Sequence, residues 1–196
     1  MLELLLFTAV PQRDMKPLAK RLIDRFGSYA NVISATPEDL SAIEGVGDTV
    51  VATLKIVRDA AVRLARHELT GRAVLSSWQD LIDYCRAAMG RESVEQFRIF
   101  FLDRKNALIG DEVQQRGTVD QTAVYPREVV KRALELNASA IIMVHNHPSG
   151  DTKPSRGDIE MTRLVKDACE KIGIALHDHV IISARGETSF RSLGHL

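Results

Sequence analysis

The chain has 196 residues, of which 45% are hydrophobic and 27% are charged, an ordinary globular composition that excludes a disordered or fibrous protein. Its 26 basic side chains balance 26 acidic ones, and the balance also holds locally, because residues 1–70 carry nine of each sign and residues 71–196 carry 17 of each. Tight binding of nucleic acid by a strongly basic domain is therefore not expected from the net charge, although a local basic face is compatible with it.

The two cysteines and the apolar runs limit the compartment. Cys85 and Cys169 stand far apart and in no CxxC arrangement, which excludes a disulfide framework and a cysteine-based zinc site and suits a reducing environment. The longest apolar runs, residues 4–7 and 140–144, are far shorter than the ~18 residues that cross a bilayer. We therefore expect a cytoplasmic protein with no membrane partner. The chain begins inside an apolar stretch with no capping residue before it, which predicts a truncated or late start.

Residues 1–70 show helical spacing throughout, and we expect them to form an all-α domain. The first predicted helix covers residues 18–26 and stops at Gly27. Thr36 is expected to cap a short helix that ends at Gly45, and Asp48 to cap a longer one. The apolar positions of that longer helix are Val51, Leu54, Val57, Ala61 and Leu64.

Residues 72–196 alternate helices with strands, and we expect them to form a second domain that follows a boundary near Thr70-Gly71. The fold class is therefore α/β or α+β, with one sheet that carries helices on its faces. The predicted elements are a helix that opens with a capping box at 77–80 and ends at Gly90, a β-hairpin of 97–102 and 107–114, a helix over 126–136, a buried strand over 140–144, a helix from Ser155 to Lys171, and strands over 180–183 and 188–191.

The residues that carry chemistry follow the buried strand, in the run HNHPSG at 145–150. Residues two apart at a strand end point to the same side, so the imidazoles of His145 and His147 are expected to converge while the residue between them faces away. Asp158 lies in the first turn of the helix that Ser155 caps. Two histidines and one carboxylate leave a fourth position free, as in catalytic zinc sites, and the water held there has a pKa of about 7.

Each residue alone also has a simpler interpretation. A histidine at a strand end is usually a hydrogen-bonding surface residue, and Ser155-x-x-Asp158 is also the pattern of a capping box. The combination of both patterns directly after an apolar strand favours the metal site.

The same residues resemble a known family. HNHPSG at 145–150, followed by PSRGD at 154–158, is similar to the JAMM motif of the JAB/MPN metallopeptidases, H-x-H-P-x(6)-S-x-x-D, and specifically to its bacterial RadC branch. Residues 117–120, 124–128 and 178–182 also resemble RadC segments, so the resemblance covers residues 72–196. It implies a JAB/MPN domain with a mixed sheet similar to that of cytidine deaminases, and a zinc-dependent hydrolase that cleaves an amide or isopeptide bond in a protein or peptide.

The resemblance also implies roles for single residues. His145, His147 and Asp158 match the zinc ligands of the family, and Ser155 resembles the serine that helps to hold the water or the oxyanion. Asn146 stands where many deubiquitinating members have Ser or Thr, so the substrate of those enzymes does not transfer to this chain.

The catalytic glutamate of the family lies upstream, on or near the first strand. Glu95 resembles it, because VEQF at 94–97 matches the wording of the RadC branch, while Glu92 and Glu112 are competing choices. Its role would be that of general base toward the water, followed by proton donation to the leaving amine. His179 is a candidate for an outer position near the metal, and equally a histidine satisfied at a strand edge.

Residues 40–47, followed by a helix, resemble the helix-hairpin-helix module of DNA repair proteins, and residues 25–39 resemble the preceding half of a paired module. The loop Gly45-Val46-Gly47 would expose backbone N–H groups to a phosphate, and Lys55 and Arg58 could add further contacts. Two acidic residues flank this loop, so a purely structural or protein-docking hairpin is at least as well supported. DNA binding through residues 40–58, with a metal domain that acts on nucleic acid or is structural, is therefore the alternative hypothesis.

Overall fold

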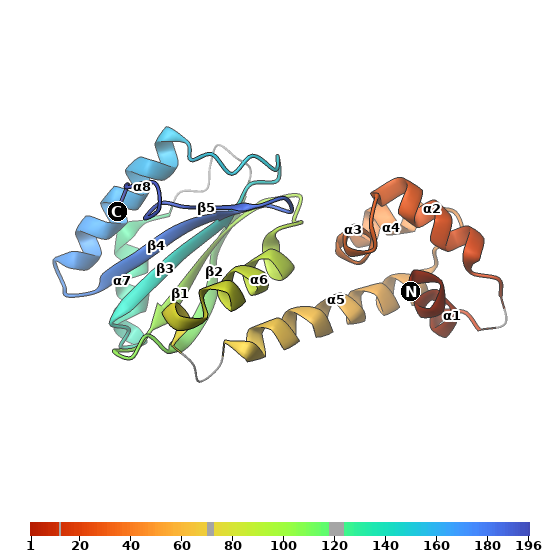
Figure 1. Ribbon diagram of the computed structural model, residues 1–196, viewed down its shortest axis with the longest axis horizontal. Coiled ribbons are helices and arrows are strands. Elements are labelled where there is room, and N and C mark those ends of the chain that lie inside the picture. The colour runs from red at the N-terminus through yellow and green to blue at the C-terminus, as the bar shows by residue number, and fades with distance from the viewer. Residues whose placement is uncertain (12, 70–72, 118–123) are drawn as a thin grey trace. The chain divides into compact units, whose positions relative to one another are not determined.

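A computed structural model describes residues 1–11, 13–69, 73–117 and 124–196 of the protein. They divide into two compact units, Met1–Leu64 and Ala65–Leu196 (Figure 1). The expected domain boundary near Thr70-Gly71 lies outside the described residues, as does most of the RadC-like segment at 117–120. None of the described helices is both long enough and apolar enough to span a bilayer.

The first unit is helical. Its helices are α1 (Leu2–Ala9), α2 (Lys16–Phe26), α3 (Tyr29–Ser34), α4 (Pro37–Ser41) and the greater part of α5 (Asp48–Glu68). The predicted stop of α2 is confirmed, because Gly27 adopts φ +83° and its N–H donates to the carbonyl of Ile23. The predicted cap of α4 is also confirmed, because the hydroxyl of Thr36 accepts from the backbone N–H of Asp39.

Three predictions for this unit are wrong. Helix α4 ends at Ser41 rather than at Gly45. The chain leaves the helical conformation after Ser41, and Gly45 lies in the turn that follows, where it adopts φ +89°. Asp48 is the first residue of α5 rather than its cap. The buried apolar face of α5 is also shorter than expected, because Leu54 is fully buried whereas Leu64 is 66% exposed. Only the first turns of α5 reach the core that α1 to α4 share.

The second unit contains one mixed sheet, as predicted. Its strands are β1 (Glu95–Leu102), β2 (Leu108–Gly117), β3 (Ala140–Asn146), β4 (Ala175–Ile182) and β5 (Glu187–Ser189). Their order is β2-β1-β3-β4-β5, and only β3 and β4 run parallel. The predicted buried strand is confirmed as central β3, every residue of which is buried. It continues through His145 and Asn146, and β4 begins five residues before the expected strand start at Val180 because it pairs along β3.

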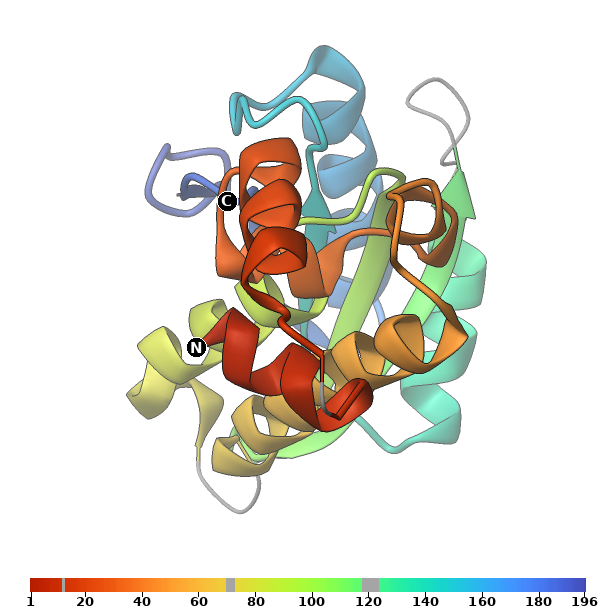
Figure 2. The same cartoon turned by 90° about the vertical axis from the view of Figure 1, so that its right-hand side faces the viewer.

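Helices cover both faces of the sheet. Helix α6 (Trp78–Met89), preceded by the short 3₁₀ helix η1 (Val74–Ser77), lies on one face, and α7 (Pro126–Glu135) and α8 (Arg156–Glu170) lie on the other (Figure 1). Figure 2 shows α6 and α7 on opposite sides of β1 and β2. One hydrophobic core lies under α7 and α8, where Phe97, Phe101 and Met143 meet Val129 and Val165.

The two expected capping boxes have opposite outcomes. The box at Ser155 is confirmed, because its hydroxyl accepts from the N–H of Asp158 and the carboxylate of Asp158 accepts from the N–H of Ser155. The box at Ser77 is wrong: η1 precedes α6 directly, and the hydroxyl of Ser77 donates to the carbonyl of Ala73 instead.

Candidate metal centre

Four side chains from three elements and one loop converge at one end of the sheet. They are Glu95, His145, His147 and Asp158, and each offers a nitrogen or oxygen atom within 4.8 Å of the others. Strand register explains the first two. Phe97 pairs with His145 across the antiparallel β1–β3 ladder, and Glu95, two residues before Phe97, lies on the same face of β1.

The loop that follows β3 and the start of α8 supply the other two. The N–H of His147 donates to the carbonyl of Ile182 at 2.9 Å, so the chain stays extended for one more residue and His147 points to the same side as His145. Asp158 is the third residue of α8, placed there by the Ser155 cap. The predicted convergence of the two imidazoles is confirmed, since their Nε2 atoms lie 2.9 Å apart.

Backbone contacts determine how His147 and Asp158 face the cluster. Nδ1 of His147 lies 2.7 Å from the carbonyl oxygen of Asp151 and must carry the hydrogen, because a carbonyl can only accept. The lone pair of the neutral ring is then on Nε2, which faces the cluster. One oxygen of Asp158, Oδ2, accepts from the N–H of Ser155 at 2.7 Å, while Oδ1 lies 3.5 Å from Nε2 of His145.

These contacts fit a cation. Around a tetrahedral zinc ion with bonds of about 2.0–2.1 Å, ligand atoms lie about 3.3 Å apart. The three separations here are 2.9 Å between the two Nε2 atoms, 3.5 Å between Nε2 of His145 and Oδ1 of Asp158, and 3.8 Å between Nε2 of His147 and Oδ2 of Asp158, so they fall on either side of that value. Two imidazole nitrogens beside two carboxylates form a dense group of acceptors, which a positive charge stabilises. The four groups can therefore hold a metal ion.

Burial tunes the ionisation of the group. His145 is 1% exposed, and burial lowers the pKa of its imidazole to about 4, which keeps the ring neutral and available as a ligand at neutral pH. Burial also raises the pKa of Glu95, and the charge of Asp158 raises it further against the opposing effect of His147. The side chains of His147 and Asp158 are 18% and 16% exposed, so solvent reaches the cluster from their side.

Comparison with known proteins identifies the family of this chain. A family model described as RadC-like JAB domain matches residues 75–195. This chain belongs to the RadC family. A UPF0758 protein of Rhodobacter capsulatus is 59% identical over all of this chain and 92% of its own length, and a second UPF0758 protein, from Ruegeria pomeroyi, is 55% identical over all of this chain and 88% of its own length.

Of the three glutamates considered from sequence, Glu95 is the one that lies in the four-residue group of this RadC-family protein. Glu112, on β2, instead pairs with Arg132 at 2.5 Å, and that hydrogen bond lowers the pKa of the Glu112 carboxyl. Glu92 lies between α6 and β1 and does not belong to the group. Asn146 faces away as predicted: its side-chain oxygen accepts from the N–H of Gln96 at 2.8 Å and so joins β3 to β1.

His179 lies directly behind the candidate ligands. It is fully buried, and its Nε2 is 2.8 Å from Nδ1 of His145. The structure therefore favours the interpretation of His179 as a residue next to the cluster over that of a histidine satisfied at a strand edge. Burial keeps the pKa of His179 well below its usual value. Sequence reasoning missed Thr162, whose hydroxyl oxygen is 2.6 Å from Nδ1 of His179. Its place four residues after Asp158, on the same face of α8, is the signal that could have found it.

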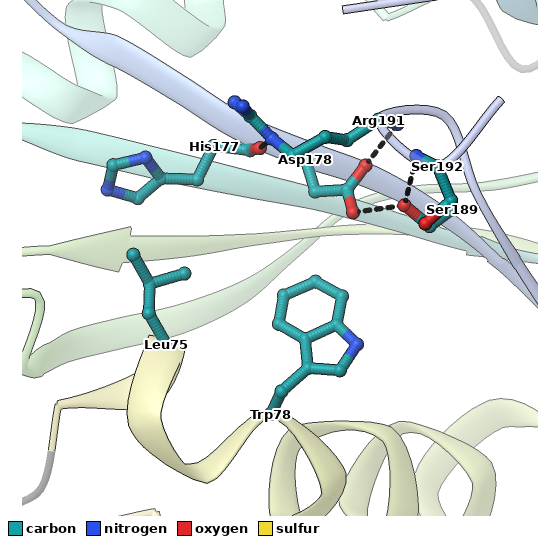
Figure 3. Close-up of a pocket in the computed structure, with 7 residues that line it drawn as sticks. All are labelled: Leu75, Trp78, His177, Asp178, Ser189, Arg191 and Ser192. Carbon is teal, nitrogen blue, oxygen red and sulfur yellow. Dashed lines mark hydrogen bonds between the residues drawn. The ribbon is translucent and has the colours of Figure 1, made fainter. Parts of the chain in front are cut away.

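A separate cavity of about 400 Å³ lies on the α6 face, where Trp78 and Leu75 face β4 and residues 189–192 (Figure 3). Asp178 dominates its polar side. Its carboxylate accepts from the hydroxyl of Ser189 at 2.5 Å and from the backbone N–H groups of Arg191 and His179 at 3.0 and 2.7 Å. The carboxylate therefore ties β4 to the residues after it and anchors the backbone that carries His179.

The glycine hairpin of the first unit departs from the sequence expectation at one residue. The ammonium of Lys55 donates to two backbone carbonyls at the C-terminal end of α3, so it stabilises that helix end rather than pointing to a phosphate. Val46 packs against the helical core, and Arg21 donates to the carbonyl just before Gly45 at 3.0 Å. DNA binding through residues 40–58 stays a prediction, which fluorescence anisotropy with labelled duplex DNA across a salt series tests.

Proposed function

We propose that this protein is a zinc-dependent hydrolase that cleaves an amide or isopeptide bond in a protein or peptide substrate. The observation that carries the proposal is the convergence of His145, His147 and Asp158 with Glu95 beside them. Nitrogen and carboxylate ligands suit zinc, and membership of the RadC family, whose JAB domain resembles that of the JAB/MPN metallopeptidases, supports the same ion.

Of the two carboxylates, we assign Asp158 as a ligand and Glu95 as the base. Oε1 of Glu95 lies 3.9 Å from Nε2 of His145, whereas Oδ1 of Asp158 lies 3.5 Å from the same atom. We assign the two histidines and Asp158 as the three ligands, which leaves a position open next to Glu95. A bound zinc ion supplies Lewis acidity, which polarises the scissile carbonyl and makes water a stronger acid.

Glu95 is suited to move the proton. Because burial raises its pKa toward neutrality, its carboxylate takes a proton from water more readily than an exposed glutamate and then gives it to the nitrogen of the leaving amine. Its position as the first residue of β1, paired with Gly117 of β2 and two residues before the pair of Phe97 with His145, holds the carboxylate near the ligands.

Ser155 can cap the helix and contact substrate at the same time. In the cap its hydroxyl oxygen accepts from the N–H of Asp158 at 3.1 Å, which does not use the hydroxyl hydrogen. We assign that hydrogen to the oxyanion that forms at the scissile carbonyl.

The free thiols of Cys85 and Cys169 support a cytoplasmic location for this reaction.

The test combines metal content with cleavage. Purified wild type, loaded with zinc, is incubated with a mixture of peptides and isopeptide-linked peptides, and new amino groups are detected by mass spectrometry. Wild type should hold one zinc per chain and cleave, while Glu95→Gln should keep the zinc and lose cleavage; Glu92→Gln, a matched change outside the cluster, should retain both. Zinc bound without any cleavage by wild type would contradict the hydrolase and leave the metal centre standing.

A further inference from the structure

A chain of three hydrogen bonds runs behind the candidate metal centre. The hydroxyl oxygen of Thr162 is 2.5 Å from the backbone carbonyl oxygen of Asp158 and 2.6 Å from Nδ1 of His179. Nε2 of His179 is in turn 2.8 Å from Nδ1 of His145. This hydrogen-bond chain starts at the backbone of one proposed ligand and ends at the ring of another, and its residues lie on α8, β4 and β3.

The carbonyl decides the direction of every bond in this chain. It can only accept, so the single hydroxyl hydrogen of Thr162 is committed to it, and the hydroxyl oxygen must accept from Nδ1–H of His179. A neutral His179 then carries no hydrogen on Nε2, and this nitrogen accepts from Nδ1–H of His145. The lone pair of His145 is left on Nε2, the atom that faces the cluster.

We infer that Thr162 and His179 are positioning residues that hold His145 in the tautomer able to bind the metal ion. The inference rests on the proposed function, in which an ion binds at Nε2. The competing tautomer is a real alternative, because a hydrogen on Nε2 of His145 would point at Nε2 of His147 at 2.9 Å and make a good hydrogen bond. That bond would close the site to a metal ion.

The residues packed around His179 and Thr162 hold this hydrogen-bond chain in place. The ring of His179 is stacked on Phe190, with centroids 4.4 Å apart, and lies against Phe97 at 5.6 Å. Its backbone N–H is held by Asp178, and its carbonyl accepts from the N–H of Phe190 at 2.9 Å. His179 is fully buried and Thr162 is 1% exposed, so water cannot replace either partner.

Thr162→Val tests this inference because valine keeps the shape of threonine and removes the hydroxyl. Nδ1–H of His179 then has no acceptor, so His179 is expected to move its hydrogen to Nε2 and donate to His145, which places the hydrogen of His145 on Nε2. Zinc affinity, measured by competition with a chromophoric chelator, should fall about 10–100-fold. Thr162→Ser restores the hydroxyl and should restore the affinity.

The tautomers can also be read directly in the zinc-free protein by long-range ¹H–¹⁵N NMR of the histidine rings. We expect the hydrogen of His145 on Nδ1 in wild type and in Thr162→Ser, and on Nε2 in Thr162→Val. A wild-type spectrum with the hydrogen on Nε2 overturns the inference, and this holds even if the valine variant does not fold. Equal zinc affinity of a folded Thr162→Val and wild type overturns it as well. Absence of zinc binding in wild type refutes the proposed function and with it the metal-binding purpose of the tautomer, whereas the tautomer itself is measured without metal, so the two failures are distinguishable.

Discussion

Replacement of Asp158 separates metal binding from folding, because this carboxylate has two tasks on two different oxygen atoms. Oδ2 accepts from the N–H of Ser155 and closes the capping box, while Oδ1 faces His145 at 3.5 Å. Asp158→Asn keeps a side-chain oxygen for the cap and removes the negative charge that a metal ligand needs. Asp158→Ala removes both.

The expected magnitudes follow from these contacts. Zinc at a hundred times its dissociation constant stabilises a protein by about 2.7 kcal/mol, which raises the Tm of a chain of this size by about 5–11 °C. Without zinc, Asp158→Asn should cost about 0.3–1 kcal/mol, because it removes an acidic group from the first turn of α8. Asp158→Ala should cost about 1 kcal/mol more, through loss of the cap.

The assay is thermal unfolding of chelator-treated protein with and without added zinc. Wild type should show the full zinc-induced rise in Tm and both Asp158 variants almost none. Asp167→Asn is the matched control, because it removes the negative charge of an acidic side chain on the same helix that lies outside the four-residue cluster and pairs with Arg163 at 3.5 Å, and it should keep the full rise. A zinc-induced rise in Asp158→Asn equal to that of wild type would refute the assignment of Asp158 as a ligand.

Three further predictions test other parts of the chain. Glu95→Gln should lower kcat about 10²–10⁴-fold. The rate of the wild type should fall as the pH drops through the raised pKa of Glu95, because a general base must be ionised to accept a proton. Measurement of kcat and kcat/KM against pH for both proteins checks the two expectations. Asp111→Ala leaves the guanidinium of Arg98 buried without its carboxylate and should cost about 3–5 kcal/mol in urea unfolding, and a loss below 1 kcal/mol would contradict this. Gly90→Ala puts a Cβ 2.8 Å from a backbone carbonyl one turn earlier and should cost about 1–3 kcal/mol in the same assay, while Gly186→Ala, with open space around it, should be tolerated.

Features that depend on a few neighbouring residues were predictable. The stop of α2 at Gly27 needs only a left-handed residue, and the cap of α8 needs only the spacing from Ser155 to Asp158. The convergence of His145 and His147 follows from the alternation of side chains along an extended chain. Each depends on residues two to four apart, whose relative positions the backbone conformation determines.

Features that depend on packing were predicted less well. The spacing of apolar residues in α5 suggested a longer buried face than the helix has, because periodicity does not tell how far the neighbouring helices extend. Lys55 carries a charge that looked available to phosphate, but α3 brings two carbonyls to it. Residues 77–80 have the pattern of a capping box, but Ser77 is the last residue of the 3₁₀ helix η1. Its hydroxyl therefore donates to the carbonyl of Ala73 and does not cap α6.

By itself, the sequence determined that two imidazoles and a capped aspartate lie at the end of a buried strand, because alternation and capping are local properties of the backbone. The sequence favoured Glu95 over Glu92 and Glu112 through a resemblance alone. Its place in the cluster depends on the tertiary structure, since the register of β1 against β3 brings Glu95 there and Glu112 lies beside Arg132. The same holds for the hydrogen bonds from Thr162 through His179 to His145, whose residues are 17 and 34 positions apart. Contacts between separate strands and helices depend on how these elements pair and pack, and no short stretch of the chain specifies that.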